Sequence, residues 1–187
     1  IFLGQKLDPE IIDKKNKKEF KKIKIDKCFS SPSQRCIETA RLNCNSNQII
    51  KSNYLKEINY GQAEGLTINQ FKKKYSNIYN KWLMGIDTNF PLGESSLDVF
   101  KRLRNFIKYE LKMVKTNRNK CIIVFTHNVV LRSLIGSQYN IKRNNWFKIN
   151  IPYFKLLEFK LNNNKLYPNI ERKKYKTIFK NFIGNLE

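Results

Sequence analysis

The apolar segment from Cys121 to Phe125 constrains the fold more than any other part of the chain. Its five consecutive apolar residues are rich in β-branched types, a pattern that predicts a strand buried on both faces. Residues 129–135 predict a helix that follows this strand and ends at Gly136. Between them stands His127, the only histidine of the sequence. Open α/β sheets bind ligands at the carboxyl ends of their strands, so His127 is a candidate functional residue. The alternative is a histidine that only fills the turn.

The length and composition predict a single domain over residues 1–187. A chain of 187 residues with 41% hydrophobic and 13% aromatic residues can form a packed core. No apolar run approaches the roughly 18 to 20 residues of a membrane span, so we expect no membrane partner and a cytoplasmic location. The sequence does not determine the oligomeric state, and a homodimer is the alternative to a monomer.

The cysteine pattern argues against a metal site. The four cysteines contain no CxxC pair, and the sequence has one histidine to join them. We therefore expect neither a metal nor a cofactor, and we interpret the cysteines as reduced thiols.

The net charge of +22 raises the question of nucleic-acid binding. The lysines are spread along the whole chain, which is equally rich in Asn, Ile, Tyr and Phe, so a bias in composition explains much of the charge. The positive electrostatic field that remains would attract anionic substrates, nucleic acid or acidic lipid without discriminating among them, and nucleic acid is not the expected partner.

Strand and helix patterns alternate along the chain, which predicts the α/β class. The expected strands are 25–29, 49–55, 121–125, 153–159 and 166–170, the last two flanking a hairpin-like turn. The expected helices are 12–23, one from Pro32 to Cys44, one or two within 66–82, 97–114, 129–135 and 175–183. Ser95 and Asp98 form a capping-box pattern at the start of the helix over 97–114.

A second polar segment, around Arg35, precedes a helix. Ser31 is a candidate N-cap, Pro32 suits the first helical position, and Gln34 completes a capping box. Arg35 then falls in the first turn, beside free backbone N–H groups. An arginine in this position can receive a phosphate or a carboxylate. The alternative is a surface arginine paired with a carboxylate of the protein.

A third polar segment, Glu57 to Gly65, follows the expected strand over 49–55. It contains two glycines and the carboxylates Glu57 and Glu64 among them, as expected for a rim loop that holds an acid over a site.

Taken in order, these segments resemble the histidine phosphatase superfamily, also called phosphoglycerate mutase-like. The resemblance covers residues 1 to about 160, and the ordered combination of motifs makes it specific. The matching motifs are Ser30-Ser31-Pro32 with Arg35, Thr39 and Ala40; Leu55 and Glu57 with Gly61 and Glu64-Gly65-Leu66; Gly93-Glu94-Ser95; and Phe125-Thr126-His127-Asn128.

This resemblance implies a three-layer α/β/α fold with a mostly parallel sheet, and phosphoryl transfer through a phosphohistidine. Arg35 and His127 would hold the phosphoryl group, and Glu57 would protonate the leaving oxygen, with Glu64 as the second choice. Asn128 stands where the family has a glycine, and its backbone N–H would contact the substrate. Gly4 would also lie near the substrate. The expected ligand is a small phosphorylated metabolite.

The Arg-His-Gly motif that carries the family's nucleophile is missing from the sequence. The segment Phe2 to Pro9 resembles the part of the family's chain that lies shortly downstream of that motif, so we expect the nucleophilic histidine upstream of residue 1. Without its central strand the sheet should have a gap. A mutase-type phosphotransferase, and an inactive protein that binds phosphoesters or nucleic acid, remain the alternatives to a phosphatase.

Overall fold

The computed structural model describes residues 1–9, 24–44, 48–111, 121–152, 156–162 and 165–168. The predicted helices over 12–23 and 175–183 lie outside these residues. Three parallel strands form the main sheet, in the order β2-β1-β3. These are β1 (Lys27–Ser30), β2 (Ile49–Lys51) and β3 (Ile122–Phe125).

Strands β1 and β3 are direct neighbours, with Lys27 opposite Ile122 and Ser30 opposite Phe125. The expected gap in the sheet is therefore wrong for the described residues, because backbone hydrogen bonds join these two strands. The chain leaves β1 toward β2 on one side and returns to β3 on the other. Such a reversal of strand order opens a crevice at the carboxyl ends of the strands, where α/β proteins bind ligands.

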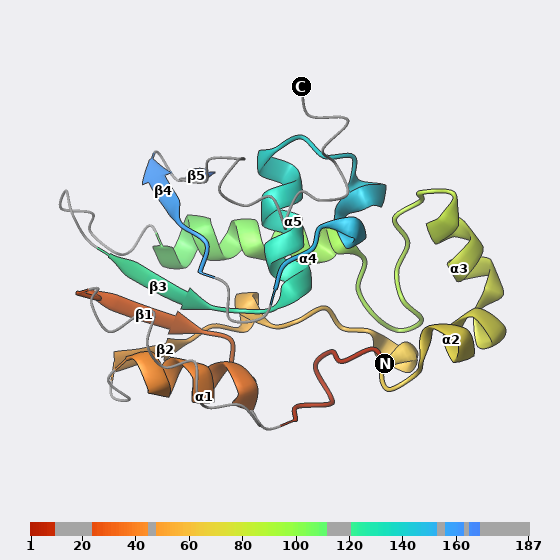
Figure 1. The fold of residues 1–187 in the computed structure, drawn as a ribbon, viewed down its shortest axis with the longest axis horizontal. Coiled ribbons are helices and arrows are strands. Elements are labelled where there is room, and N and C mark those ends of the chain that lie inside the picture. The colour runs from red at the N-terminus through yellow and green to blue at the C-terminus, as the bar shows by residue number, and fades with distance from the viewer. Residues whose placement is uncertain (10–23, 45–47, 112–120, 153–155, 163–164, 169–187) are drawn as a thin grey trace.

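Helices cover both faces of this sheet, which confirms the three-layer α/β/α prediction (Figure 1). Helix α1 (Gln34–Asn43) lies on one face, and α4 (Ser96–Asn105) and α5 (Asn128–Gln138) lie on the other. Alternate residues of β1 point to the two layers. Cys28 belongs to the cluster that contains residues of α1, and Phe29 to the large core that includes residues of α4 and α5.

The remaining described elements are shorter. They are the 3-10 helices η2 (Asn53–Leu55), η3 (Gly61–Ala63) and η5 (Arg143–Lys148), the helices α2 (Ile68–Lys74) and α3 (Ser76–Leu83), the π-helical turn η4 (Phe106–Leu111), and the antiparallel strands β4 (Phe159–Asn162) and β5 (Lys165–Pro168). The two short helices within 66–82 and the turn of the hairpin were predicted. The first hairpin strand, expected over 153–159, is instead Phe159–Asn162, and residues 156–158 are not in a strand. The strand expected over 49–55 is shorter, because its second half forms η2.

Helix α5 does not end at Gly136, as predicted, but continues to Gln138. A Cβ atom at Gly136 would lie 2.2 Å from ring atoms of Trp146, which packs against this turn of the helix. The glycine therefore serves the close approach of helix and indole, and its role as a helix terminator was a wrong prediction.

Helix α1 begins two residues later than its sequence pattern indicates. Ser33 is the N-cap and makes no capping hydrogen bond with its side chain. The predicted capping box of Ser31 and Gln34 is wrong, because Asp8 takes its place. The Asp8 carboxylate accepts hydrogen bonds from the backbone N–H groups of Gln34 and Arg35.

The predicted capping box at the start of α4 is present. Ser95 Oγ accepts a hydrogen bond from the N–H of Asp98 (3.2 Å), and the Asp98 carboxylate accepts one from the N–H of Ser95 (3.1 Å). Among the described residues, no helix combines the length and the apolar character that crossing a membrane requires.

Replacing Ser95 with alanine is expected to lower the free energy of unfolding by about 1 kcal/mol, because the first turn of α4 loses its cap. Urea unfolding measures this change. Ser96→Ala, one residue further on, is the matched control, since its side chain makes none of these capping bonds. Equal midpoints for Ser95→Ala and Ser96→Ala would contradict the prediction.

Candidate active site

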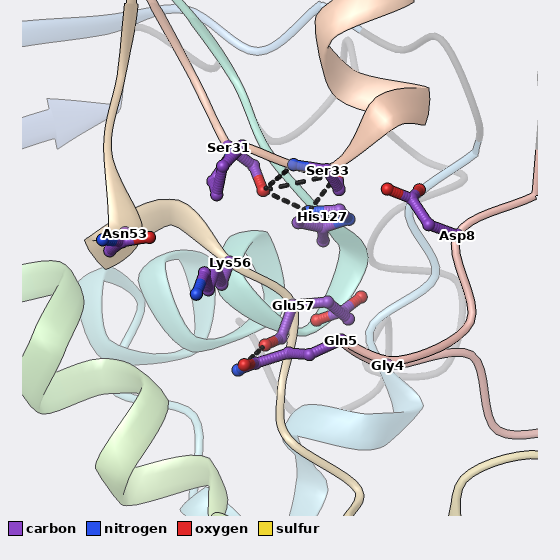
Figure 2. A pocket seen from close by; sticks show the side chains of 10 residues that line it. Gly4, Gln5, Asp8, Ser31, Ser33, Asn53, Lys56, Glu57 and His127 are labelled. Carbon is purple, nitrogen blue, oxygen red and sulfur yellow. Dashed lines mark hydrogen bonds between the residues drawn. The ribbon is translucent and has the colours of Figure 1, made fainter.

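A pocket of about 300 Å³ opens at the carboxyl ends of β1 and β3, at the reversal of strand order. Figure 2 shows its lining side chains, with His127 near the centre, Ser31 and Ser33 next to it, and Lys56 and Asp8 on opposite sides of it. Ten residues line it: Gly4, Gln5, Asp8, Ser31, Pro32, Ser33, Asn53, Lys56, Glu57 and His127. Three sequence-predicted site residues, Gly4, Glu57 and His127, are therefore brought together.

His127 is the N-cap residue of α5, two positions after β3 ends. Its Nε2 is hydrogen bonded to Ser31 Oγ (2.8 Å) and Ser33 Oγ (3.2 Å), and lies 3.5 Å from Cys36 Sγ. The side chain is 7% exposed. Burial, with a smaller contribution from the charges of Arg35 and Arg102, lowers the pKa of His127 to about 3. The imidazole is neutral at physiological pH, so one of its two ring nitrogens carries an N–H and the other is an acceptor.

Glu57 is a buried acid in the same pocket, 7% exposed. Its carboxyl oxygens accept hydrogen bonds from the N–H groups of Ile58 (2.9 Å) and Val129 (3.5 Å). Burial outweighs these bonds and raises the pKa of Glu57 to about 7. A carboxyl group with such a pKa carries a proton in a large fraction of molecules at neutral pH, which a general acid requires.

Glu64 has a different place from Glu57. Its Oε1 accepts hydrogen bonds from the backbone N–H groups of Gly4 (3.1 Å), Lys6 (2.7 Å) and Leu7 (2.6 Å). Glu64 does not line the pocket and holds the segment that carries Gly4. A Cβ atom at Gly4 would lie 2.8 Å from the carbonyl oxygen of Ile58, so only glycine fits at this wall.

Arg35 is held by the segment of residues 4–8. Its guanidinium donates hydrogen bonds to the carbonyl oxygens of Gly4 and Leu7 (both 2.9 Å) and pairs with Asp8 Oδ1 at 3.0 Å. Among the described residues Arg35 is not part of the pocket lining. The structure thus shows the alternative interpretation, pairing with a carboxylate of the protein, and phosphate binding by Arg35 stays a prediction.

The side chain of Asn128 also lies outside the pocket lining. Its Nδ2 donates to the carbonyl oxygen of Ile151 (3.4 Å), and its Oδ1 is buried without a hydrogen-bond partner among the described residues. Substrate binding by its backbone N–H, at the first position of α5, stays a prediction. In the described part of the chain, no group of three or more His, Cys, Asp or Glu side chains is arranged to hold a metal ion.

Sequence reasoning did not assign the remaining lining residues to the site. Ser31 was interpreted as a helix cap, although its position directly after β1, beside β3, was a usable signal. Lys56 directly precedes the predicted acid Glu57, which was a second signal. No local pattern marks Gln5 or Asp8, because loop contacts across the chain bring them to the site.

The fold and this pocket define an α/β protein whose ligand site combines a neutral imidazole, two hydroxyl groups and a protonatable carboxyl group at a switch point of the sheet. The sequence model of the histidine phosphatase superfamily (branch 1) matches residues 14–171. The chain belongs to this family.

Curated relatives and solved structures agree with the assignment. Phosphoserine phosphatase 1 of Hydrogenobacter thermophilus is 25% identical over 137 residues, which cover 68% of this chain and 64% of that protein. The chain thus spans less than two thirds of the length of the curated relatives that it matches.

Two solved structures show the same fold. Bacillus stearothermophilus YhfR superimposes with a TM-score of 0.66 at 19% identity, covering 83% of this chain and 77% of its own. The mycobacterial glucosyl-3-phosphoglycerate phosphatase superimposes with a TM-score of 0.64 at 19% identity, covering 79% of this chain and 75% of its own. At these identities the similarity establishes the fold alone.

Proposed function

We propose that the protein hydrolyses small phosphomonoesters through a phosphohistidine intermediate. One observation carries the proposal: Glu57, whose pKa is about 7, lines the same pocket as the neutral imidazole of His127. Phosphoryl transfer needs donors for the phosphoryl oxygens and an acid for the leaving oxygen. His127, with Ser31 and Ser33 beside it, supplies the donors, and Glu57 supplies the acid.

Family membership adds support, and so do the names of the relatives, which include phosphoserine phosphatases. In this proposal the nucleophile is a second histidine, carried by a segment outside residues 1–187. It attacks phosphorus while Glu57 protonates the departing oxygen. Water then attacks the phosphohistidine, releases phosphate and restores the imidazole.

The experiment is to trap the intermediate in the full-length protein. Incubation with a ³²P-labelled small phosphomonoester, followed by a rapid quench, should label the protein through a bond that acid cleaves and alkali does not, as expected for phosphohistidine. The labelled protein should lose its label at a rate that accounts for the rate of phosphate release. A label stable to acid, or phosphate release without any label, would contradict the intermediate.

A second candidate is a protein that binds phosphoesters without turnover. It is favoured by the hydroxyl groups of Ser31 and Ser33 beside the neutral imidazole of His127, since such a group of polar side chains can bind a phosphoester without any nucleophile. A phosphoester that stabilises the full-length protein against heat, with no phosphate released, would support this candidate over the hydrolase. A protein that binds nucleic acid is the other non-catalytic alternative. Its affinity for nucleic acid would fall steeply as the salt concentration rises.

A further inference from the structure

The pocket has a deep end and a mouth, which differ in the exposure of their residues. Ser31 and His127 are 0% and 7% exposed, and Glu57 is 7% exposed. At the mouth, Lys56 and Asp8 are half-buried, and Asn53 and Gln5 are exposed. If phosphoryl transfer takes place at His127, the phosphate occupies the deep end. The organic part of the ester then points toward this mouth.

The backbone on both sides of Lys56 is fixed by contacts with three other segments. The carbonyl oxygen of Leu55 accepts a hydrogen bond from Thr126 Oγ1 (2.9 Å). The carbonyl oxygen of Glu57 accepts hydrogen bonds from Gln5 Nε2 (2.8 Å) and Arg102 (3.0 Å). The backbone of Lys56 is therefore held in place beside the acid, so that binding of a ligand has to order only the lysine side chain.

Lys56 also supplies the positive charge of the pocket. Among the described residues of the lining, it is the only one with a cationic side chain, and no described residue accepts a hydrogen bond from its ammonium group. The carboxylate of Asp8 is paired with Arg35, and Glu57 has a raised pKa. The mouth of the pocket thus holds one cation without a counter-ion in the described part of the protein.

We propose that Lys56 determines specificity by binding a carboxylate on the organic part of the phosphoester, with the amide of Asn53 as a second donor. The preferred substrates are then small phosphorylated carboxylic acids. This inference rests on the proposed phosphatase function and names its substrate class. The pocket volume of about 300 Å³ agrees with a small ligand, since it lies at the lower end of small-molecule sites.

The test compares O-phosphoserine with O-phosphoethanolamine, which differ only by the carboxylate. The full-length protein should prefer O-phosphoserine. Lys56→Met should lower kcat/KM for O-phosphoserine roughly tenfold or more, as expected for loss of a charge-assisted hydrogen bond, chiefly through a higher KM. Turnover of O-phosphoethanolamine should change by less than about twofold, because that compound has no group for Lys56 to bind.

Two further variants sharpen the test. Lys56→Arg keeps the cation and should keep most of the preference. Lys73→Met makes the same change at an exposed position of α2 outside the pocket, and should leave both substrates unaffected.

The possible outcomes separate the inference from the proposed function. Equal losses for both compounds in Lys56→Met would place the lysine on the phosphate and overturn the inference. The inference would also be overturned if Lys56→Met kept the wild-type preference for O-phosphoserine. The same holds if the protein hydrolysed other phosphoesters but neither O-phosphoserine nor O-phosphoethanolamine. All three outcomes leave the phosphatase function standing. Failure to release phosphate from any ester would overturn both.

Discussion

Replacing His127 with alanine is expected to lower kcat/KM for phosphomonoesters by about a hundredfold or more, a loss of at least about 2.7 kcal/mol in transition-state stabilisation. The imidazole lies at the deep end of the pocket, and its pKa of about 3 keeps it neutral throughout the working pH range. In the proposed mechanism it would therefore act as a positioned hydrogen-bond donor rather than as a charge. The loss should appear mainly in kcat if the donor binds the transition state more strongly than the substrate.

Steady-state kinetics of the full-length protein measure this loss, and two controls make it interpretable. Ser137→Ala removes a hydroxyl group at the other end of α5 and should retain full activity. Thermal unfolding of His127→Ala must show that the variant is folded under assay conditions. A folded His127→Ala protein with nearly unchanged kcat/KM would remove His127 from the chemistry.

The sequence indicated His127, because it follows a short apolar strand and α/β folds place such positions at one edge of the sheet. The residue pattern gave Glu57 and Glu64 together as carboxylates of a rim loop, and the choice of Glu57 came from the family resemblance. The same reasoning placed Gly4 near the substrate only through the family resemblance. It also predicted the capping box of α4, since all its partners lie within four consecutive residues.

The sequence was insufficient where distant segments replace a local signal. The start of α1 depends on Asp8, which lies 26 residues before Gln34 and occupies the position expected of a local cap. Gly136 looks like a helix terminator in isolation, and only the packing of Trp146 against it explains why a glycine stands inside the helix. Arg35 is the clearest case. Its place beside a helix N-terminus was predicted, but Asp8 and two backbone carbonyl groups decide the direction of its guanidinium.

Replacing Glu57 with glutamine should separate substrates by their leaving groups. Glutamine keeps the shape of the side chain but cannot supply a proton. For an alkyl phosphate such as O-phosphoethanolamine, kcat/KM should fall by a factor of about 100 to 10,000, because the alkoxide leaves poorly without protonation. For p-nitrophenyl phosphate, whose leaving group is stable as an anion, the loss should be much smaller.

The pH profile gives an independent measurement of the same role. A general acid is active in its protonated form, so with a pKa of about 7 the Glu57 carboxyl group should lose activity as the pH rises through 7. Wild-type kcat/KM for the alkyl phosphate should therefore decline on the alkaline side, and this decline should be absent in Glu57→Gln. The substrate's own ionisation, near pH 6, affects both proteins and cancels in the ratio of their profiles. The titration of His127 causes no change in kcat/KM near pH 7, because its imidazole remains neutral there.

A matched control for this variant is Glu38→Gln, the same chemical change on α1 at a residue outside the pocket lining. It should keep the wild-type preference between the two esters and the wild-type pH profile. If Glu57→Gln instead lowers the turnover of both esters by the same factor, the carboxyl group does not protonate the leaving oxygen. Its part would then be to orient the N-terminus of α5 through Val129, and the acid would have to be another group.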